Sequence, residues 1–172
     1  MSVKQILTEP NKLLRQISKP VEKVGDEERV VMDDMLDTMY AAPGIGLAAI
    51  QIGVPKRIIV MDISREEDKK EPMYFVNPVI KNKNKDKSKY EEGCLSVPDQ
   101  FAEIERPNAC EVEYLDYYGK KKLLKAEGLL ATCIQHEMDH LEGILFIDYL
   151  SKLKKSMIIK KLSKIKSKRI IV

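Results

Sequence analysis

The sequence predicts an α+β fold, in which mostly antiparallel sheets pack around a central helix, with a further helix near each end of the chain. Apolar residues recur at helical spacing after residue 26, residues 129–142 are densely apolar over a helical length, and strand-like segments occupy the chain between them. Residues 110–118 alternate between apolar and polar side chains and precede Gly119, which is typical of a β-hairpin. Strands that are grouped between helices favour this fold over a doubly wound parallel sheet.

Three helices follow from start and stop signals. The N-terminal helix is predicted to have Asp26 as its N-cap, and Pro43 and its neighbouring glycines end it. Its apolar stripe consists of Val31, Met35, Leu36 and Met39. The central helix covers residues 129–142, with Gly143 as its C-terminal stop. The last helix is predicted over residues 151–168, with an apolar stripe of Leu153, Met157, Ile158, Leu162 and Ile165.

The strands are read from apolar runs and from alternation. Residues 57–63 and 73–80 are predicted strands, and residues 120–125 form the second half of the hairpin. The charged segments 64–72 and 81–89 are predicted to be solvent-exposed loops.

The bulk composition predicts a single domain over residues 1–172, long enough to bury a core without disulfides. Apolar runs are too short to span a bilayer, and the N-terminus lacks a signal-peptide core, so we expect a cytoplasmic protein that does not enter membranes. We also expect a monomer. Three cysteines at irregular spacing favour free thiols or metal ligation over a disulfide framework.

The only two histidines, His136 and His140, flank Glu137 in a His-Glu-x-x-His pattern. Positions four apart on a helix lie on one face, so both imidazoles can bind one metal ion. The glutamate between them projects where it can act as a general base on a water at that ion. The pattern therefore predicts a hydrolytic metal site.

A hydrolytic site needs a third protein ligand and one open position. Acidic residues are absent after Asp148, and Phe146 stands where an extended motif would need a histidine, so the third ligand is predicted to lie upstream. Cys133 lies about 10 Å from His140 along the helix and can only line the pocket. Cys110 belongs to the apolar face of a strand. Cys94, after Gly93 in a segment of mixed polarity, is the candidate.

Three segments resemble, in order and spacing, the signature motifs of the peptide deformylase family. They are "GIGLAAIQ" (44–51), "EGCLS" (92–96) and "QHEMDHLEG" (135–143), and the resemblance extends over nearly the whole chain. It implies removal of the N-formyl group from the initiator methionine of nascent proteins. The family's native ion is usually Fe²⁺, with Zn²⁺, Ni²⁺ or Co²⁺ able to occupy the same site.

The resemblance also implies residue roles. Cys94, His136 and His140 correspond to the metal ligands, and Glu137 to the general acid and base. Gln51 and the backbone N–H of Leu95 correspond to the groups that hold the oxyanion. The backbone of Gly46 corresponds to a substrate-binding position, and the pocket for the methionine side chain corresponds to Ile45, Glu92, Leu129 and Cys133.

One departure from the family is Phe101, which stands where many bacterial members carry an arginine that approaches the substrate backbone. Arg106 still matches a basic position of the family. The change leaves the chemistry of the site alone and concerns how the peptide beyond methionine is held.

Residues 151–172 carry nine of the 30 Lys and Arg and none of the 27 Asp and Glu. The rest of the chain therefore has a net charge of about −6. This basic helix either packs on the body with a solvated face or, as the resemblance implies, contacts ribosomal RNA.

Two other functions stay open from the sequence. One is a metallopeptidase of other specificity on the same His-Glu-x-x-His site, and the other is a structural zinc module with an RNA-binding tail.

Overall fold

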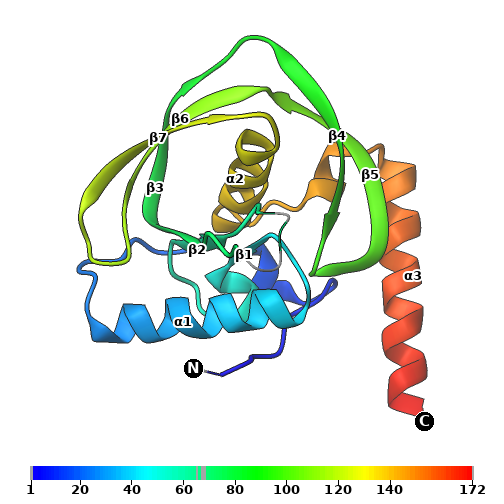
Figure 1. The fold of residues 1–172 in the computed structure, drawn as a ribbon. Helices are drawn as coiled ribbons and strands as arrows, with labels where there is room; N and C mark the ends of the chain where they lie inside the picture. Colours follow the sequence, from blue (N-terminus) through cyan, green and yellow to red (C-terminus); the bar gives the residue numbers. More distant parts are fainter. Residues whose placement is uncertain (1, 65, 67–68, 172) are drawn as a thin grey trace.

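The computed structural model describes residues 2–64, 66 and 69–171, with side chains up to residue 164. Its helices α1 (Asp26–Ala41), α2 (Gly128–Leu141) and α3 (Lys152–Ile171) accompany two antiparallel sheets, so the predicted α+β fold is confirmed. Figure 1 shows α2 in the middle, with the strands around it, α1 below and α3 along the outer side of β5. Within the described residues, no helix combines the length and the apolar character needed to cross a membrane.

The larger sheet has five strands in the order β1-β2-β3-β6-β7, and the smaller one pairs β4 with β5. Each neighbouring pair of these strands is antiparallel. The strand bounds are β1 Gly46–Ala48, β2 Ile58–Met61, β3 Met73–Lys83, β4 Lys87–Cys94, β5 Val97–Pro107, β6 Ala109–Leu115 and β7 Lys121–Glu127. The pairing of β6 with β7 confirms the predicted hairpin.

Strand β2 is buried on both faces because it lies between two helices. Its side chains alternate, so Ile58 and Val60 pack with the methionines of α1, whereas Ile59 and Met61 pack against α2. A strand covered on both sides reads as a continuous apolar run, which is how residues 58–61 appear in the sequence. This sandwich holds α2 at a fixed place in the core.

The helix ends differ by one residue from those expected. Asp26 is the first residue of α1, and Gly25 is the N-cap. The side chain of Glu28 reaches back and accepts a hydrogen bond from the backbone N–H of Gly25 at 3.0 Å. Helix α2 begins and ends one residue earlier than predicted, with Glu142 as its C-cap, and the predicted stop Gly143 adopts the left-handed backbone conformation with φ of 73°.

The prediction that residues 81–89 form an exposed loop is wrong over most of its length. Strand β3 continues to Lys83, and β4 begins at Lys87. The charged side chains face solvent and pair across the strands, as Lys81 does with Glu113 at 3.8 Å. Cross-strand pairing therefore overrides the loop-like composition of this segment.

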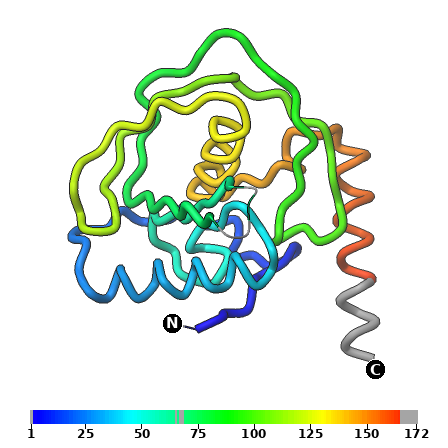
Figure 2. Tube along the Cα trace, in the orientation of Figure 1, coloured from blue at the N-terminus to red at the C-terminus, as the bar shows by residue number. Residues whose placement is uncertain are grey.

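The predicted C-terminal helix is present as α3, but only part of its predicted stripe packs on the body. Leu162 and Ile158 join an apolar cluster with Ile104 of β5, whereas Leu153 and Met157 are exposed. The side chain of Ile165, the last residue of that stripe, lies outside the described residues; Figure 2 shows where that part of the trace begins.

Candidate metal centre

Cys94 lies at the end of β4, at the tip of the β4–β5 hairpin. It pairs with Val97 of β5, so Leu95 and Ser96 form the turn between the strands. The turn contains no glycine or asparagine, which are the usual sequence signals of such hairpins. The sequence therefore located the cysteine without revealing the hairpin that presents it.

The structure brings Cys94 to the two histidines of α2. The Sγ of Cys94 lies 3.3 Å from Nε2 of His140, and the ligand atoms of Cys94, His136 and His140 all lie within 4.8 Å of one another. Ligands of a tetrahedral Zn²⁺ site lie roughly 3.5 Å apart, given metal–sulfur and metal–nitrogen bonds of about 2.3 and 2.0 Å. One thiolate and two imidazoles at this spacing fit a single divalent ion.

The two histidines differ in protonation. Burial would lower the pKa of His136, but its hydrogen bonds with Cys94 and Glu92 raise it, so this imidazole must lose a proton when it binds a metal ion. Burial is the main cause that lowers the pKa of His140, and the neighbouring His136 adds to it. The imidazole of His140 is therefore neutral at neutral pH and can donate a lone pair. The Nδ1 of His136 lies 2.8 Å from Oε1 of Glu92, which leaves its Nε2 free to face the cysteine. A carboxylate behind a ligating histidine fixes both the tautomer and the ring plane.

Glu137 is buried beside these ligands, with Oε1 at 4.0 Å from Nε2 of His136. Its Oε2 atom has no hydrogen-bond partner among the described residues. Burial raises the pKa of Glu137 to about 7; His136 opposes this rise and Glu92 adds to it. A carboxyl group with a pKa near neutrality can both take up and release a proton at working pH.

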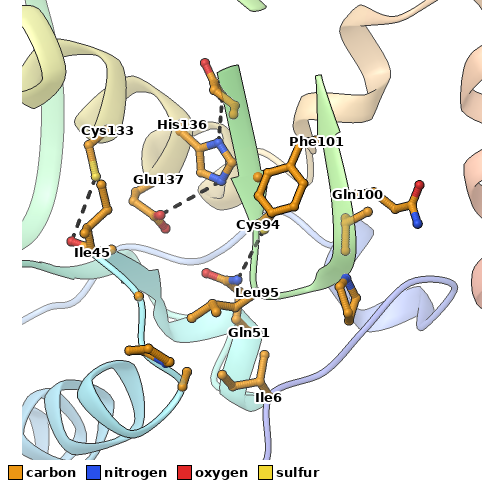
Figure 3. A pocket seen from close by; sticks show the side chains of 18 of the residues that line it. Ile6, Ile45, Gln51, Cys94, Leu95, Gln100, Phe101, Cys133, His136 and Glu137 are labelled. Atoms are coloured by element: carbon orange, nitrogen blue, oxygen red, sulfur yellow. Dashed lines mark hydrogen bonds and ion pairs between the residues drawn. The ribbon is translucent and has the colours of Figure 1, made fainter. Parts of the chain in front are cut away.

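The carboxamide of Gln51 faces the sulfur of Cys94. The backbone N–H of Ala48 donates to Oε1 of Gln51 at 2.9 Å, which directs the NH₂ group of Gln51 toward the site. That NH₂ group donates to Oγ of Ser96 at 3.0 Å and lies 3.6 Å from Sγ of Cys94. Figure 3 shows Gln51, Cys94, His136 and Glu137 directed toward a common space.

This space opens into a cavity of about 800 Å³. All the sequence-predicted site residues line it except His140, which is completely buried behind it. Those lining residues are Ile45, Gly46, Gln51, Glu92, Cys94, Leu95, Leu129, Cys133, His136 and Glu137. Phe101 also lines the cavity, and its ring lies against Gly93 on the neighbouring strand.

The other two cysteines are not metal-ligand candidates. The Sγ of Cys133 lies 4.0 Å from the carbonyl oxygen of Ile45, in the wall of the cavity. Cys110 is buried in the core cluster between the sheet and α2, as its alternation predicted. Burial raises the pKa of both thiols, so both remain protonated at neutral pH.

The role of Arg106 was not apparent from the sequence, which indicated only a basic position. Its Nε and Nη2 atoms donate to the two carboxylate oxygens of Glu92 at 2.7 and 3.0 Å. Burial alone would raise the pKa of Glu92, but the hydrogen bonds from His136 and Arg106 outweigh burial and lower it. Glu92 is therefore an anion that holds His136.

Comparisons with known proteins show the family to which the chain belongs. The family model described as polypeptide deformylase matches residues 3–156. The chain belongs to the polypeptide deformylase family. It is 91% identical to the peptide deformylase of Pelagibacter ubique over the full length of both chains. Two crystal structures of the Ehrlichia chaffeensis deformylase resemble it, at TM-scores of 0.91 and 0.90 and identities of 45% and 48%.

The match to the first of these structures covers 96% of this chain and 97% of the matched chain. The match to the second, which is a complex with actinonin, covers 95% of this chain and 98% of the matched chain. The deformylase likeness therefore extends over both sheets and α2, including the segments that carry the candidate metal centre.

Proposed function

We propose that this chain is a metal-dependent deformylase that hydrolyses the N-formyl group of N-terminal formylmethionine in newly synthesised proteins and releases formate. Membership of the deformylase family and 91% identity to a curated relative support this activity. The observation that carries it is the convergence of Cys94, His136 and His140 beside Glu137, at the inner end of a cavity.

Cys94, His136 and His140 would hold one divalent ion, leaving an open coordination position toward the cavity. The ion supplies Lewis acidity at the formyl carbonyl and at the attacking water when it is bound. A thiolate with two imidazoles accepts several metals, and we propose Fe²⁺ as the native ion, with Zn²⁺, Ni²⁺ and Co²⁺ as possible substitutes.

Glu137 moves the proton in this proposal. Its carboxylate takes a proton from the water that attacks the formyl carbon, and it then delivers that proton to the leaving nitrogen of methionine. The C–N bond of the formamide breaks, so the products are formate and a free N-terminal amine. The pKa of about 7 for Glu137 lies where both transfers are accessible, and a bound cation would lower it toward the base form.

Two donors would stabilise the oxygen that gains charge as the water attacks. The NH₂ group of Gln51 is already oriented by the bond from Ala48 to its carbonyl oxygen. The backbone N–H of Leu95, next to Cys94 in the hairpin turn, is the second proposed donor. Donors held in place before the reaction lower the barrier because they need no reorganisation when charge develops.

The methionine side chain is proposed to enter the cavity wall formed by Ile45, Leu129 and Cys133, with Glu92 behind it. The backbone of Gly46 would bind the extended peptide by main-chain hydrogen bonds. Phe101, at the exposed part of the same cavity, would offer an apolar surface to the residues that follow methionine.

The deciding experiment is anaerobic purification, metal analysis and an assay with formyl-Met-Ala that measures both formate and free alanine. Formate release with an intact Met–Ala bond supports the deformylase. Cleavage of that bond, or of an internal bond in a longer peptide, would instead support a metallopeptidase of other specificity on the same site. Absence of metal and of both activities would reject the proposed function.

Three further proposals concern the setting of the enzyme. We propose that it works in the cytoplasm, because its formylated substrates are nascent chains, and that it is a monomer. The exposed lysines of α3 are proposed to contact ribosomal RNA, since phosphate contacts by lysine need no sequence recognition. Packing of Leu162 on the body keeps this helix in place while its lysines face outward.

A further inference from the structure

A hydrogen-bonded chain continues from His136 away from the cavity. His136 is held by Glu92, and both oxygens of Glu92 are held by the planar fork of Arg106. A two-bond fork fixes the plane of a carboxylate as well as its position. The orientation of the His136 ring therefore depends on whatever fixes the guanidinium of Arg106, which is only 5% exposed.

The outer side of Arg106 is held by two groups. Its Nη1 donates to Oδ2 of Asp139 at 2.9 Å, and the hydroxyl of Tyr149 donates to the same oxygen at 2.8 Å. The guanidinium also lies over the ring of Tyr149, at 5.0 Å from the ring centroid. Tyr149 thus supports Arg106 in two ways. Its ring contacts the guanidinium directly, and its hydroxyl holds the Asp139 carboxylate that binds the guanidinium.

These three side chains line a second cavity, of about 580 Å³, on the side of α2 away from the first. Tyr149 is 52% exposed and belongs to the short 3-10 helix η3 (Phe146–Tyr149). Phe146 and Ile147 anchor this element in the core, whereas Tyr149 does not belong to any buried cluster. Tyr149 is therefore placed to restrain Arg106 without contributing much to the core.

We propose that Tyr149 is a positioning residue for the metal site, which acts through Asp139 and Arg106 to fix Glu92 and thereby the ring of His136. The proposal rests on the proposed function only in requiring that Cys94, His136 and His140 bind a metal. Without Tyr149, the guanidinium loses the ring beside it, and Asp139 loses the hydroxyl that holds its carboxylate, so Arg106 is held less firmly on the side of the second cavity. The fork on Glu92 then loosens, and His136 releases metal more readily.

The test uses Co²⁺ as the probe metal and compares Tyr149→Phe with Tyr149→Leu. Tyr149→Phe keeps the ring over Arg106 and loses the hydroxyl, whereas Tyr149→Leu loses both. The measurement is the rate at which the cobalt-loaded protein loses its ion to excess chelator, followed by the visible absorption of thiolate-bound Co²⁺. Residues behind metal ligands typically change metal affinity 10–100-fold, so we expect metal loss about tenfold faster for Tyr149→Leu, with Tyr149→Phe between it and the parent.

The matched control is Tyr118→Leu, because Tyr118 is 72% exposed and its ring contacts Tyr117 in the β6–β7 turn. A second control is a double-mutant cycle, in which Tyr149→Phe is added to Asp139→Ala. If the hydroxyl acts through Asp139, it has no further effect on metal loss in that background.

Unchanged metal loss in Tyr149→Leu, or equal acceleration in Tyr118→Leu, would overturn the proposal. So would a fall in the unfolding temperature of the metal-free Tyr149→Leu protein that accounts for the faster loss, because that result would indicate a structural role. A parent protein that binds Co²⁺ as described but releases no formate refutes the deformylase activity and leaves this inference standing. A parent that binds no Co²⁺ refutes the inference.

Discussion

Gly46 lies so close to Glu137 that a Cβ atom on residue 46 would stand 2.7 Å from Oε1 of that carboxylate and 3.0 Å from its Cδ. Real Cβ atoms do not approach other heavy atoms so closely, so any side chain at position 46 would push Glu137 aside. Glu137, the proposed proton carrier, can therefore take its position only because residue 46 of β1 has no side chain.

Gly46→Ala is therefore expected to lower kcat/KM for formyl-Met-Ala by about 100-fold, because displacing a catalytic group by about 1 Å has an effect of this size. Metal content should be unchanged, since the ligands of the proposed site lie elsewhere. The comparison is Gly25→Ala, whose added Cβ would meet Glu28 at an ordinary 3.5 Å. Full activity in Gly46→Ala would contradict the proposed role of Glu137.

Glu137→Ala should separate metal binding from turnover. We expect the variant to purify with the parent's metal content and to release formate about 10²–10⁴-fold more slowly, which is the usual contribution of a general acid–base group. Metal analysis of both proteins and a formate assay at saturating substrate provide the measurement. A variant that loses its metal would show that Glu137 is itself a ligand.

The three cysteines should differ in their reaction with iodoacetamide. In metal-free protein we expect Cys94 to be alkylated first, because it is partly exposed whereas Cys110 and Cys133 are buried. Burial also raises the pKa of the two buried thiols, and the thiolate is the reacting form. Mass spectrometry of digests gives the order of modification.

Metal loading should protect Cys94 from this reaction and leave the slow modification of Cys110 and Cys133 unchanged. Equal alkylation of Cys94 with and without metal would remove it from the proposed ligand set.

Asp148 should contribute to stability at neutral pH and lose that contribution in acid. Burial opposes its ionisation, but hydrogen bonds from Arg15 and Lys155 outweigh burial and lower its pKa in the folded state. A lowered folded-state pKa stabilises the protein above the unfolded pKa of about 4, and the stabilisation disappears as the pH falls through the folded value.

We therefore expect Asp148→Asn to lower the free energy of unfolding by about 1–2 kcal/mol at pH 7 and by less at pH 3. Urea unfolding at both pH values measures this difference. The same loss at both pH values would show that packing, and not charge, carries the effect of Asp148.

Ribosome binding by α3 can be tested without removing the helix, which would expose its apolar contacts with β5. Changing exposed lysines to glutamine should abolish co-sedimentation with ribosomes at low salt and leave activity on formyl-Met-Ala unchanged. The substituted residues are Lys152, Lys154, Lys160, Lys161 and Lys164. Lys155 is spared because it forms an ion pair with Asp148 at 2.7 Å.

The matched control instead changes five exposed lysines in or next to the ends of β3, β4 and β7, namely Lys83, Lys85, Lys87, Lys120 and Lys122. If both sets reduce co-sedimentation equally, general charge explains binding, and α3 has no special role.

Local sequence patterns predicted much of the fold because they reflect local physics. The helical period placed α1, and apolar density with a glycine stop placed α2, each within one or two residues, and the alternation after residue 109 placed the β6–β7 hairpin. The β4–β5 hairpin was missed because its turn, at Leu95 and Ser96, lacks the glycine or asparagine typical of two-residue turns and because its strands are highly charged. This segment is extended because its two strands pair with each other, and no local sequence pattern records that pairing.

By itself, the sequence determined the chemistry at the centre of the candidate site, because the spacing of His136 and His140 on one helix is a local property. Only the tertiary structure decided how that chemistry is held. Glu92, Arg106, Asp139 and Tyr149 come from two strands, α2 and η3, and the bonds that join them to one another and to His136 link residues between 10 and 44 positions apart. Side chains so distant along the chain meet only after the sheets have folded around α2, which is the physical reason that this network cannot be read from the sequence.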